Sequence, residues 1–266
     1  MEIQLYQVDA FADRAFSGNP AAVCQLDEWI DDERLQQIAE ENNLSETAFY
    51  VVVDEGIELR WFTPEHEVDL CGHATLATAH VLFEHQQFSS KQIHFFTKSG
   101  DLIVSKSSAC EQMYDMNFPA SLPSVVETSD LLLSSLGVSQ SEVLGVRAAQ
   151  DYLVVLPSEA EVRAVSPNFS VMAKLDRRGV IVTAAGDAVD FVSRCFYPKY
   201  RVNEDPVTGS AHCQMAPYWA EKLAKTKLVA KQLSKRTGTI FCHLKGDRVI
   251  LSGKAADYLV GKIIID

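Results

Sequence analysis

The first half of the chain alternates apolar strands with two helical segments. Apolar and polar residues alternate from Met1 to Asp9, which is typical of a half-buried strand. Residues 31–44 carry apolar side chains at helical spacing, and residues 47–53 and 57–62 predict a β-hairpin. Residues 74–83 are apolar almost without interruption. They predict a helix that is buried on most sides, inside a curled sheet.

The second half repeats this order of elements. Strands are expected at 142–149, 152–156, 240–244, 248–253 and 258–265, a hairpin over 180–196, and helices within 168–175 and 211–224. Hairpins outnumber strand–helix–strand crossovers. The pattern therefore predicts α+β lobes with mainly antiparallel sheets.

A short motif occurs twice and indicates an internal duplication. Residues 60–64 (Arg-Trp-Phe-Thr-Pro) return in altered form as residues 194–198 (Arg-Cys-Phe-Tyr-Pro). In each copy a strand ends in Pro, an acidic loop follows, and a Gly-X-Ala turn opens an apolar helix, at residues 68–75 and again at 203–211. Two similar lobes would present two helix N-termini.

The lobe boundary is predicted near two prolines. The 266 residues suit two domains of about 130 residues. Pro119 and Pro123 interrupt regular structure and mark the crossing between lobes. We therefore expect an N-terminal lobe of residues 1–117 and a C-terminal lobe of residues 118–266, with the functional site between them.

Composition and charge limit the classes of molecule that the protein is expected to bind. The net charge of −12 and a pI near 5.0 leave no basic stripe for nucleic acid or anionic lipid. The start of the chain lacks the features of a signal peptide, and no segment approaches the length of a membrane span. The six cysteines form no C-x-x-C pair, so reduced thiols in a cytoplasmic protein are expected. A small molecule is the expected partner.

Glu46 is the most suggestive single acid. Leu44, Ala48 and Phe49 flank it. An acid in apolar surroundings has its pKa raised toward the range that is useful for proton transfer. The alternative is a capping carboxylate or one at the edge of a hairpin.

Two glycine turns are candidate anion sites. Gly72-His73 and Gly209-Ser210 each precede an apolar helix, where free backbone N–H groups and the helix dipole favour a substrate carboxylate. Either turn alone could be an ordinary tight turn, but their recurrence at equivalent positions favours a paired ligand site. Asn19, in a Gly-Asn-Pro turn, is a further candidate for ligand contact.

The remaining candidates have open roles. His73 could supply a proton, orient a carboxylic acid or cap its helix. Asp205 could hold His73 or a substrate amine or hydroxyl, or simply form a turn with the following proline. Cys71 could be a thiolate base at a helix N-terminus. The repeat places Thr208 opposite it, so a two-cysteine racemase pair is not present.

Metal and nucleotide cofactors are not indicated. No metal site is expected, because the seven histidines show no recognisable ligand spacing. The sequence also contains no P-loop and no dinucleotide fingerprint.

Four motifs, taken in order, resemble the phenazine-biosynthesis PhzF family. They are Asp9-Ala-Phe-Ala through Gly18-Asn-Pro, Asn43-Leu-Ser-Glu-Thr-Ala-Phe49, Leu70-Cys-Gly-His-Ala-Thr-Leu-Ala77 and Glu204-Asp-Pro-Val-Thr-Gly-Ser-Ala-His212. The resemblance implies a diaminopimelate epimerase-like α+β fold of two pseudo-symmetric lobes, each a curled, mostly antiparallel sheet around a central helix, with the active site in the cleft between them. It also implies an enzyme without a cofactor, usually a homodimer.

The resemblance also assigns roles to residues. In the phenazine-making member, a glutamate of the Ser-Glu-Thr motif moves a proton from one carbon of a cyclohexadiene acid to another, and the matching residue here is Glu46. The residues that match those accompanying it are His73, Asp205 and Ser210, while Gly72, Gly209 and Asn19 would help to hold the substrate carboxylate.

Three functions follow from these expectations. The first is an isomerase that shifts a proton on a small carboxylic acid, with Glu46 as general acid and base. The second is an amino-acid epimerase or racemase that depends on Cys71, and the third is a non-catalytic metabolite-binding protein. Family members act on different substrates, so phenazine chemistry itself is not implied.

Overall fold

The computed structural model describes residues 1–108 and 110–265, and the chain divides into two compact units. Unit 1 contains the described residues of Met1–Asn117 and Ser252–Asp266, and unit 2 contains Phe118–Leu251. The expected division also fell at residue 117, but it assigned the C-terminal residues to the second lobe. They lie in unit 1 because strand β17 (Arg248–Ile264) runs antiparallel to β1 (Glu2–Ala10).

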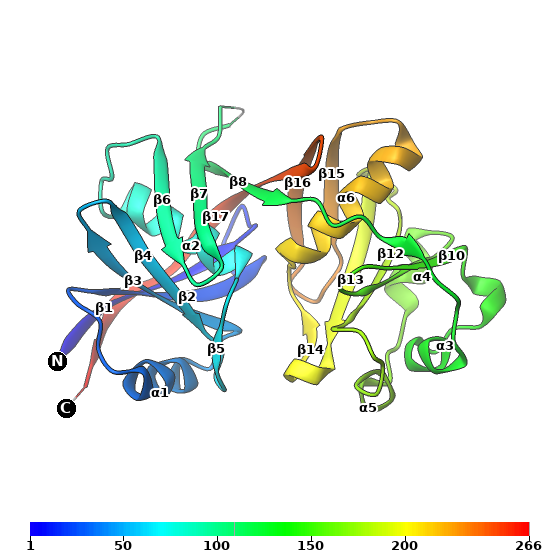
Figure 1. Cartoon of the computed structure of the whole chain (residues 1–266), viewed down its shortest axis with the longest axis horizontal. Helices are drawn as coiled ribbons and strands as arrows, with labels where there is room; N and C mark the ends of the chain where they lie inside the picture. The colour runs from blue at the N-terminus through cyan, green and yellow to red at the C-terminus, as the bar shows by residue number, and fades with distance from the viewer. Residues whose placement is uncertain (109, 266) are drawn as a thin grey trace. The chain divides into compact units, whose positions relative to one another are not determined.

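Unit 1 is a sheet with one central and one flanking helix (Figure 1). After β1 its elements are β2 (Asn19–Leu26), α1 (Asp32–Asn42), β3 (Glu46–Val53), β4 (Gly56–Phe62), β5 (Glu67–Val68), α2 (Gly72–Glu84), β6 (Gln92–Thr97), β7 (Gly100–Lys106) and β8 (Met113–Pro119). Every residue of α2 from His73 to Phe83 is buried, as the apolar run predicted. On α1, Leu35 and Ile38 pack with Phe49 of β3 in a second apolar cluster.

Unit 2 carries its own sheet and core (Figure 1). Its elements are β9 (Ser124–Val125), α3 (Asp130–Leu136), η1 (Gln140–Glu142), β10 (Gly145–Ala148), β11 (Tyr152–Val155), α4 (Glu159–Ala164), α5 (Phe169–Met172), β12 (Val180–Ala185), β13 (Phe191–Tyr197), η2 (Pro198–Tyr200), β14 (Val202–Asp205), α6 (Gly209–Leu223), β15 (Lys227–Gln232) and β16 (Gly238–Lys245). All residues of α6 from Ala211 to Ala220 are buried. The fold is thus α+β with a central helix in each unit.

The two units share one strand topology. In unit 1, β2 pairs parallel with β3, β3 antiparallel with β4, β4 antiparallel with β5 and parallel with β6, and β6 antiparallel with β7. In unit 2, β11, β12, β13, β14, β15 and β16 repeat these pairings in the same order and sense. The helix follows the short fourth strand in both units. Hairpins and antiparallel pairs therefore dominate, as the pattern of turns predicted.

The repeated arginines make equivalent contacts. Arg60 forms a two-point ion pair with Glu67 at 2.7 and 2.9 Å, and Arg194 does the same with Glu204 at 2.7 and 3.0 Å. Each guanidinium also lies 5.1 Å from the ring two residues further along its strand. The same side chains thus join the same pair of strands in each repeat.

Some elements differ from those predicted. The short helices α3 and α4 and the strand β15 were not expected. With seven and six residues, α3 and α4 are too short to show a clear apolar period, and serine N-caps begin both. The two closing strands expected at 248–253 and 258–265 are one continuous strand, β17.

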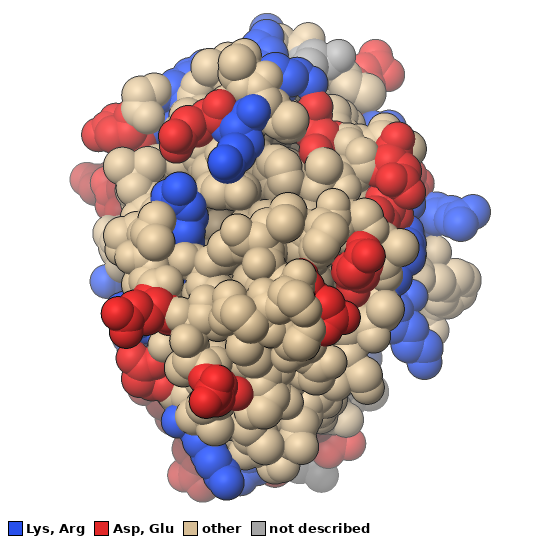
Figure 2. All heavy atoms as spheres, turned by 90° about the vertical axis from the view of Figure 1, so that its right-hand side faces the viewer, with Lys and Arg blue, Asp and Glu red and all other residues tan. Residues whose placement is uncertain are grey.

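No helix among the described residues is long and apolar enough to cross a membrane. Figure 2 shows the face of the molecule that lies to the right in Figure 1. On it, Lys and Arg side chains are interspersed with Asp and Glu side chains around a largely uncharged centre. This face therefore carries charges of both signs.

Candidate active site

Glu46 lies at the first position of β3, where local structure fixes it. Helix α1 ends at Asn42, and its C-cap residue, Asn43, takes the left-handed conformation that turns the chain into the strand. Glu46 then pairs in parallel with Ala21 of β2, and Asn42 donates a 3.1 Å hydrogen bond to Thr47. The Glu46 side chain is 17% exposed, so it lies near the surface of the sheet without being open to bulk solvent.

His73 meets Glu46 from the first turn of α2. Its Nε2 lies 3.2 Å from Glu46 Oε2, and its Nδ1 lies 3.4 Å from Cys71 Sγ. Burial lowers the pKa of His73 from 6.5 to about 3. The ring is therefore neutral at physiological pH and carries one N–H group, because desolvation disfavours the charged form.

This arrangement suits a proton that moves between carboxylate and ligand. A neutral imidazole has one donor and one acceptor nitrogen. When a rotation of either side chain aligns Nε2 with Oε2, which lies 3.2 Å away, the Nε2–H tautomer would donate to an ionised Glu46. The Nδ1–H tautomer would accept from a protonated Glu46. His73 can therefore remain uncharged in contact with either protonation state of Glu46.

Asn19 begins β2, two residues before Ala21, which is the β2 partner of Glu46. The turn that leads to it is tight, because Gly18 has φ +68° and an added Cβ there would lie 2.1 Å from the Ala10 carbonyl oxygen. Asp9 accepts a 2.8 Å hydrogen bond from the backbone N–H of Phe16 at the start of the same turn. Asn19 is fully buried on a rigid turn beside the strand that holds Glu46.

The N-terminal turn of α2 contains Gly72. Its N-cap residue, Cys71, makes no side-chain capping hydrogen bond within the described chain, and Thr75 donates 2.6 Å to the Cys71 carbonyl. In unit 2, the N-cap of α6 is Thr208, and its carbonyl lies 2.7 Å from His212 Nδ1. In both helices a side chain four residues after the N-cap therefore contacts the N-cap carbonyl oxygen.

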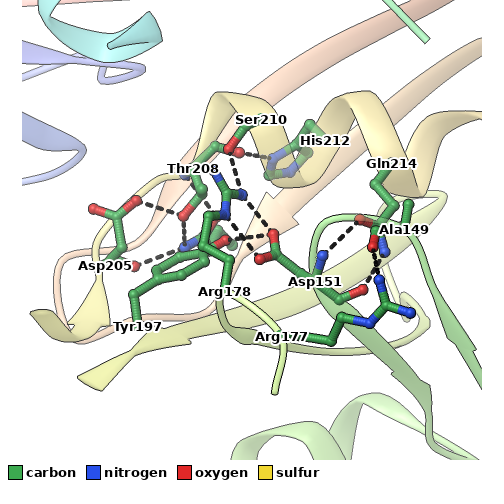
Figure 3. A network of polar contacts seen from close by, with 11 residues as sticks. Ala149, Asp151, Arg177, Arg178, Tyr197, Asp205, Thr208, Ser210, His212 and Gln214 are labelled. Carbon is green, nitrogen blue, oxygen red and sulfur yellow. Dashed lines mark hydrogen bonds and ion pairs between the residues drawn. The ribbon is translucent and has the colours of Figure 1, made fainter. Parts of the chain in front are cut away.

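A dense polar network surrounds the start of α6 (Figure 3). The hydroxyl of Thr208 donates a 2.5 Å hydrogen bond to Asp205. The side-chain amide of Gln232 on β15 donates a 2.7 Å hydrogen bond to the Asp205 carbonyl and accepts a 2.9 Å hydrogen bond from the Thr208 N–H. The loop that presents Asp205 and Gly209 is therefore fixed from both sides by a buried amide.

Ser210 is held by a different set of residues. Arg178 donates 2.9 Å to Ser210 Oγ and forms a two-point ion pair with Asp151 at 2.9 and 2.5 Å. Asp151 is only 1% exposed and also accepts a 3.3 Å hydrogen bond from Tyr197. The Gln214 amide donates 3.0 Å to the Asp151 carbonyl from within α6 (Figure 3). Ser210 therefore has one position, set by a buried ion pair.

These supporting residues were missed by the sequence analysis. Asp151, Arg178 and Tyr197 come from separate strands and loops and show no common spacing. One signal was present, because Gln214 is a polar residue inside an apolar helix. A buried amide needs hydrogen-bond partners, and its presence there indicates a polar network.

The candidate residues thus fall into two groups. Glu46, Gly72 and His73 lie together in unit 1, with Asn19 on the neighbouring strand. Asp205, Gly209 and Ser210 lie on the loop and first turn of α6 in unit 2.

Two clusters in the described chain could offer donor atoms to a metal. Glu46, Cys71 and His73 form one, and His80, His85 and Asp257 form the other, with donor atoms within 4.8 Å of one another in each. The second joins one helix end to a strand 172 residues further along the chain. Motif spacing cannot reveal a cluster of this kind.

Each unit is a sheet with a central helix, and in unit 1 Glu46 lies beside the first turn of that helix. A predicted epimerase from Pseudomonas aeruginosa has this fold, with a TM-score of 0.81 at 19% identity over 99% of this chain and 100% of its own. The family model of the phenazine biosynthesis-like proteins, PhzC–PhzF, matches residues 8–261. The chain belongs to this family.

Relatives of much higher sequence identity support the same family membership. An uncharacterised isomerase from Pseudomonas aeruginosa is 53% identical over 263 residues, which cover 99% of each chain. The crystal structure of a PhzF-family protein from Enterococcus faecalis superposes with a TM-score of 0.95 at 45% identity, covering 100% of both chains. The resemblance to the family and the expected fold are confirmed, and the protein is an isomerase.

Proposed function

We propose that this isomerase shifts a proton between two carbon atoms of a small carboxylic acid without a cofactor, with Glu46 as general base and then general acid. The observation that carries the proposal is the 3.2 Å contact between Glu46 and a buried His73. A single carboxylate that can both accept and return a proton is sufficient for such a shift.

The reaction conserves atoms and electrons. The Glu46 carboxylate takes a proton from a carbon next to an unsaturated, carboxylate-bearing system, and the electron pair of the broken C–H bond moves into that system. The protonated Glu46 then returns the proton to a second carbon, where a new C–H bond forms. His73 stays neutral throughout, because its ring can face Glu46 with a donor or an acceptor.

We assign substrate binding to Asn19, Gly72, Gly209 and Ser210. Gly72 and Gly209 begin α2 and α6, and the first backbone N–H groups of a helix have no partner within the helix. Such turns favour a carboxylate through direct hydrogen bonds and the helix dipole. Developing negative charge on the substrate would be stabilised in the same way.

We assign Asp205 a catalytic supporting role in which it orients a polar group of the substrate. Its carboxylate already accepts from Thr208, and Gln232 fixes its backbone. A carboxylate accepts hydrogen bonds from hydroxyl and amine donors, so Asp205 is a chemically suitable partner for a substrate hydroxyl or amine.

A second candidate reaction uses Cys71 as the base of an amino-acid epimerase. The Sγ atom lies 3.4 Å from His73 Nδ1, a distance at which the imidazole could take the thiol proton. Against it, Thr208 occupies the equivalent N-cap in the repeat. A two-base epimerase would need a second proton-transferring group, and a threonine hydroxyl is too weak an acid and base to be one.

The experiment is a search by NMR in D2O. A panel of unsaturated carboxylic acids and amino acids is incubated with the wild-type protein and with the variants Glu46→Gln, Cys71→Ser and Glu55→Gln. Glu55 is the matched control, since it lies on the exposed turn between β3 and β4. We expect deuterium uptake at carbon in at least one unsaturated acid, lost in Glu46→Gln and kept in the other two variants. Uptake that depends on Cys71 and not on Glu46 would establish the epimerase instead, and tight binding without any uptake would indicate a metabolite-binding protein.

We also propose that the protein forms a homodimer and is located in the cytoplasm. Phe16 and Tyr258 are 74% and 50% exposed and contact each other with ring centroids 5.6 Å apart, which provides an apolar surface for a second copy. The six cysteines form no C-x-x-C pair, which favours a reducing compartment. Light scattering of the wild type and of Tyr258→Glu tests the dimer, and fractionation of cells tests the location.

A further inference from the structure

Two histidines and one aspartate converge at the C-terminal end of α2. His80 Nε2 lies 3.2 Å from Asp257 Oδ1, and His85 Nε2 lies 3.0 Å from the same oxygen. The three donor atoms lie within 4.8 Å of one another. His80 and His85 come from the last turn of α2 and its C-cap, and Asp257 comes from β17, all within unit 1.

The contacts around His80 need more protons than the neutral side chains supply. The Tyr114 hydroxyl lies 3.1 Å from Glu84 Oε1 and 3.0 Å from His80 Nδ1, and His80 Nε2 lies 3.2 Å from Asp257 Oδ1. The hydroxyl has one proton and a neutral imidazole has one, so two protons serve three contacts. A further proton on the ring, or a cation between His80 Nε2 and Asp257 Oδ1, makes up the difference.

We propose that His80, His85 and Asp257 form a binding site for a divalent transition-metal ion, Zn²⁺ in the first place, with water as the fourth ligand. Two imidazoles and a carboxylate are a recurrent zinc donor set. In a tetrahedral site with metal–ligand distances of about 2.0–2.1 Å, neighbouring ligand atoms lie roughly 3.3 Å apart. The two measured separations, 3.0 and 3.2 Å, are close to this value.

The surroundings match those of a metal site in two further respects. A histidine ligand normally donates its second ring N–H to an oxygen that is itself hydrogen-bonded, and the chain from His80 through Tyr114 to Glu84 has this form. The side chains of His80, His85 and Asp257 are 6%, 25% and 42% exposed, so an ion can enter from the solvent side.

The site is separate from the proposed chemistry. His80 follows His73 by seven residues on α2, a distance of about 10 Å along the helix. A metal ion here would join the end of the central helix to β17 and stabilise unit 1. The inference therefore does not depend on the role of Glu46.

The test uses metal-free full-length protein and two readouts. Zn²⁺ affinity is measured by competition with a chromophoric chelator, and Co²⁺ is added in a parallel titration to detect the visible absorption of a low-symmetry site. The ligand variants are His85→Ala and Asp257→Asn, both at partly exposed positions, and Tyr114→Phe tests the supporting contact. The controls are His94→Ala, an exposed histidine beside Asp101, and Cys71→Ser, which removes a donor of the other cluster.

We expect one Zn²⁺ per chain in the wild type and a rise in melting temperature on adding it. Each ligand variant should lose affinity at least about 100-fold and lose the rise, and Tyr114→Phe should lose about 10- to 100-fold. Both controls should bind as the wild type does. The inference is overturned if the wild type binds no stoichiometric ion, if binding survives both ligand variants, or if Cys71→Ser abolishes it.

Discussion

Replacing His73 with glutamine should make the protein less sensitive to acid, although it removes the imidazole that contacts Glu46. The physical reason is that the buried ring resists protonation. Its pKa is about 3 in the folded protein against 6.5 when exposed. As the pH falls below 6.5, the unfolded chain takes up a proton at this position and the folded chain does not, so stability is lost.

The size of the effect follows from the two pKa values. Above the unfolded pKa both states are neutral at this residue and the contribution is near zero. At about pH 5 the free energy of unfolding is roughly 2 kcal/mol lower than it is above pH 6.5, because each pH unit between the two pKa values is worth about 1.4 kcal/mol. Glutamine cannot titrate, so His73→Gln removes this loss.

The assay is urea unfolding of unit 1 at about pH 7.5 and pH 5, followed by tryptophan fluorescence in a Trp219→Phe background, so that Trp29 and Trp61 report alone. The free energy of unfolding of the wild type should fall between the two pH values by roughly 2 kcal/mol more than that of His73→Gln. His66→Gln, at an exposed histidine, is the matched control and should behave as the wild type does. Parallel pH dependences for the wild type and His73→Gln would refute the reasoning.

Two further predictions concern the supports of the site. Arg178→Met should lower the free energy of unfolding of unit 2 by about 3 kcal/mol, because it leaves the buried Asp151 without its cation. The double variant Arg178→Met/Asp151→Asn should recover most of this loss. Both are measured by urea unfolding followed by the fluorescence of Trp219. Gly18→Ala should lower the melting temperature markedly, because φ +68° and the carbonyl 2.1 Å from the new Cβ both oppose a side chain. Gly145→Ala, where nothing lies within 4 Å, should be close to neutral, and equal shifts for the two would contradict this explanation.

Much of the fold was predictable because its signals are local or repeated. The nearly continuous apolar run at 74–83 indicated a buried helix, and the structure buries every residue of it. The duplication of an arginine strand, an acidic loop and a glycine turn indicated two similar units, and both the strand pairings and the ion pairs of Arg60 and Arg194 repeat.

The rest depends on contacts between distant residues, which no local pattern contains. Residues 252–265 were assigned to the second lobe because they follow it in sequence, whereas backbone pairing with β1 places them in unit 1. The buried pair of Asp151 and Arg178 and the cluster of His80, His85 and Asp257 likewise form only after the chain has folded.

The central claim is that one carboxylate moves the proton, and the most direct measurement is the rate of deuterium transfer from D2O to a substrate carbon in wild type and in Glu46→Gln. Cys71→Ser provides the comparison. The account predicts that exchange falls by at least about 100-fold in Glu46→Gln, as expected when a general acid–base group is removed, and stays near the wild-type rate in Cys71→Ser. Full exchange by Glu46→Gln, with the protein folded as the wild type is, would contradict it.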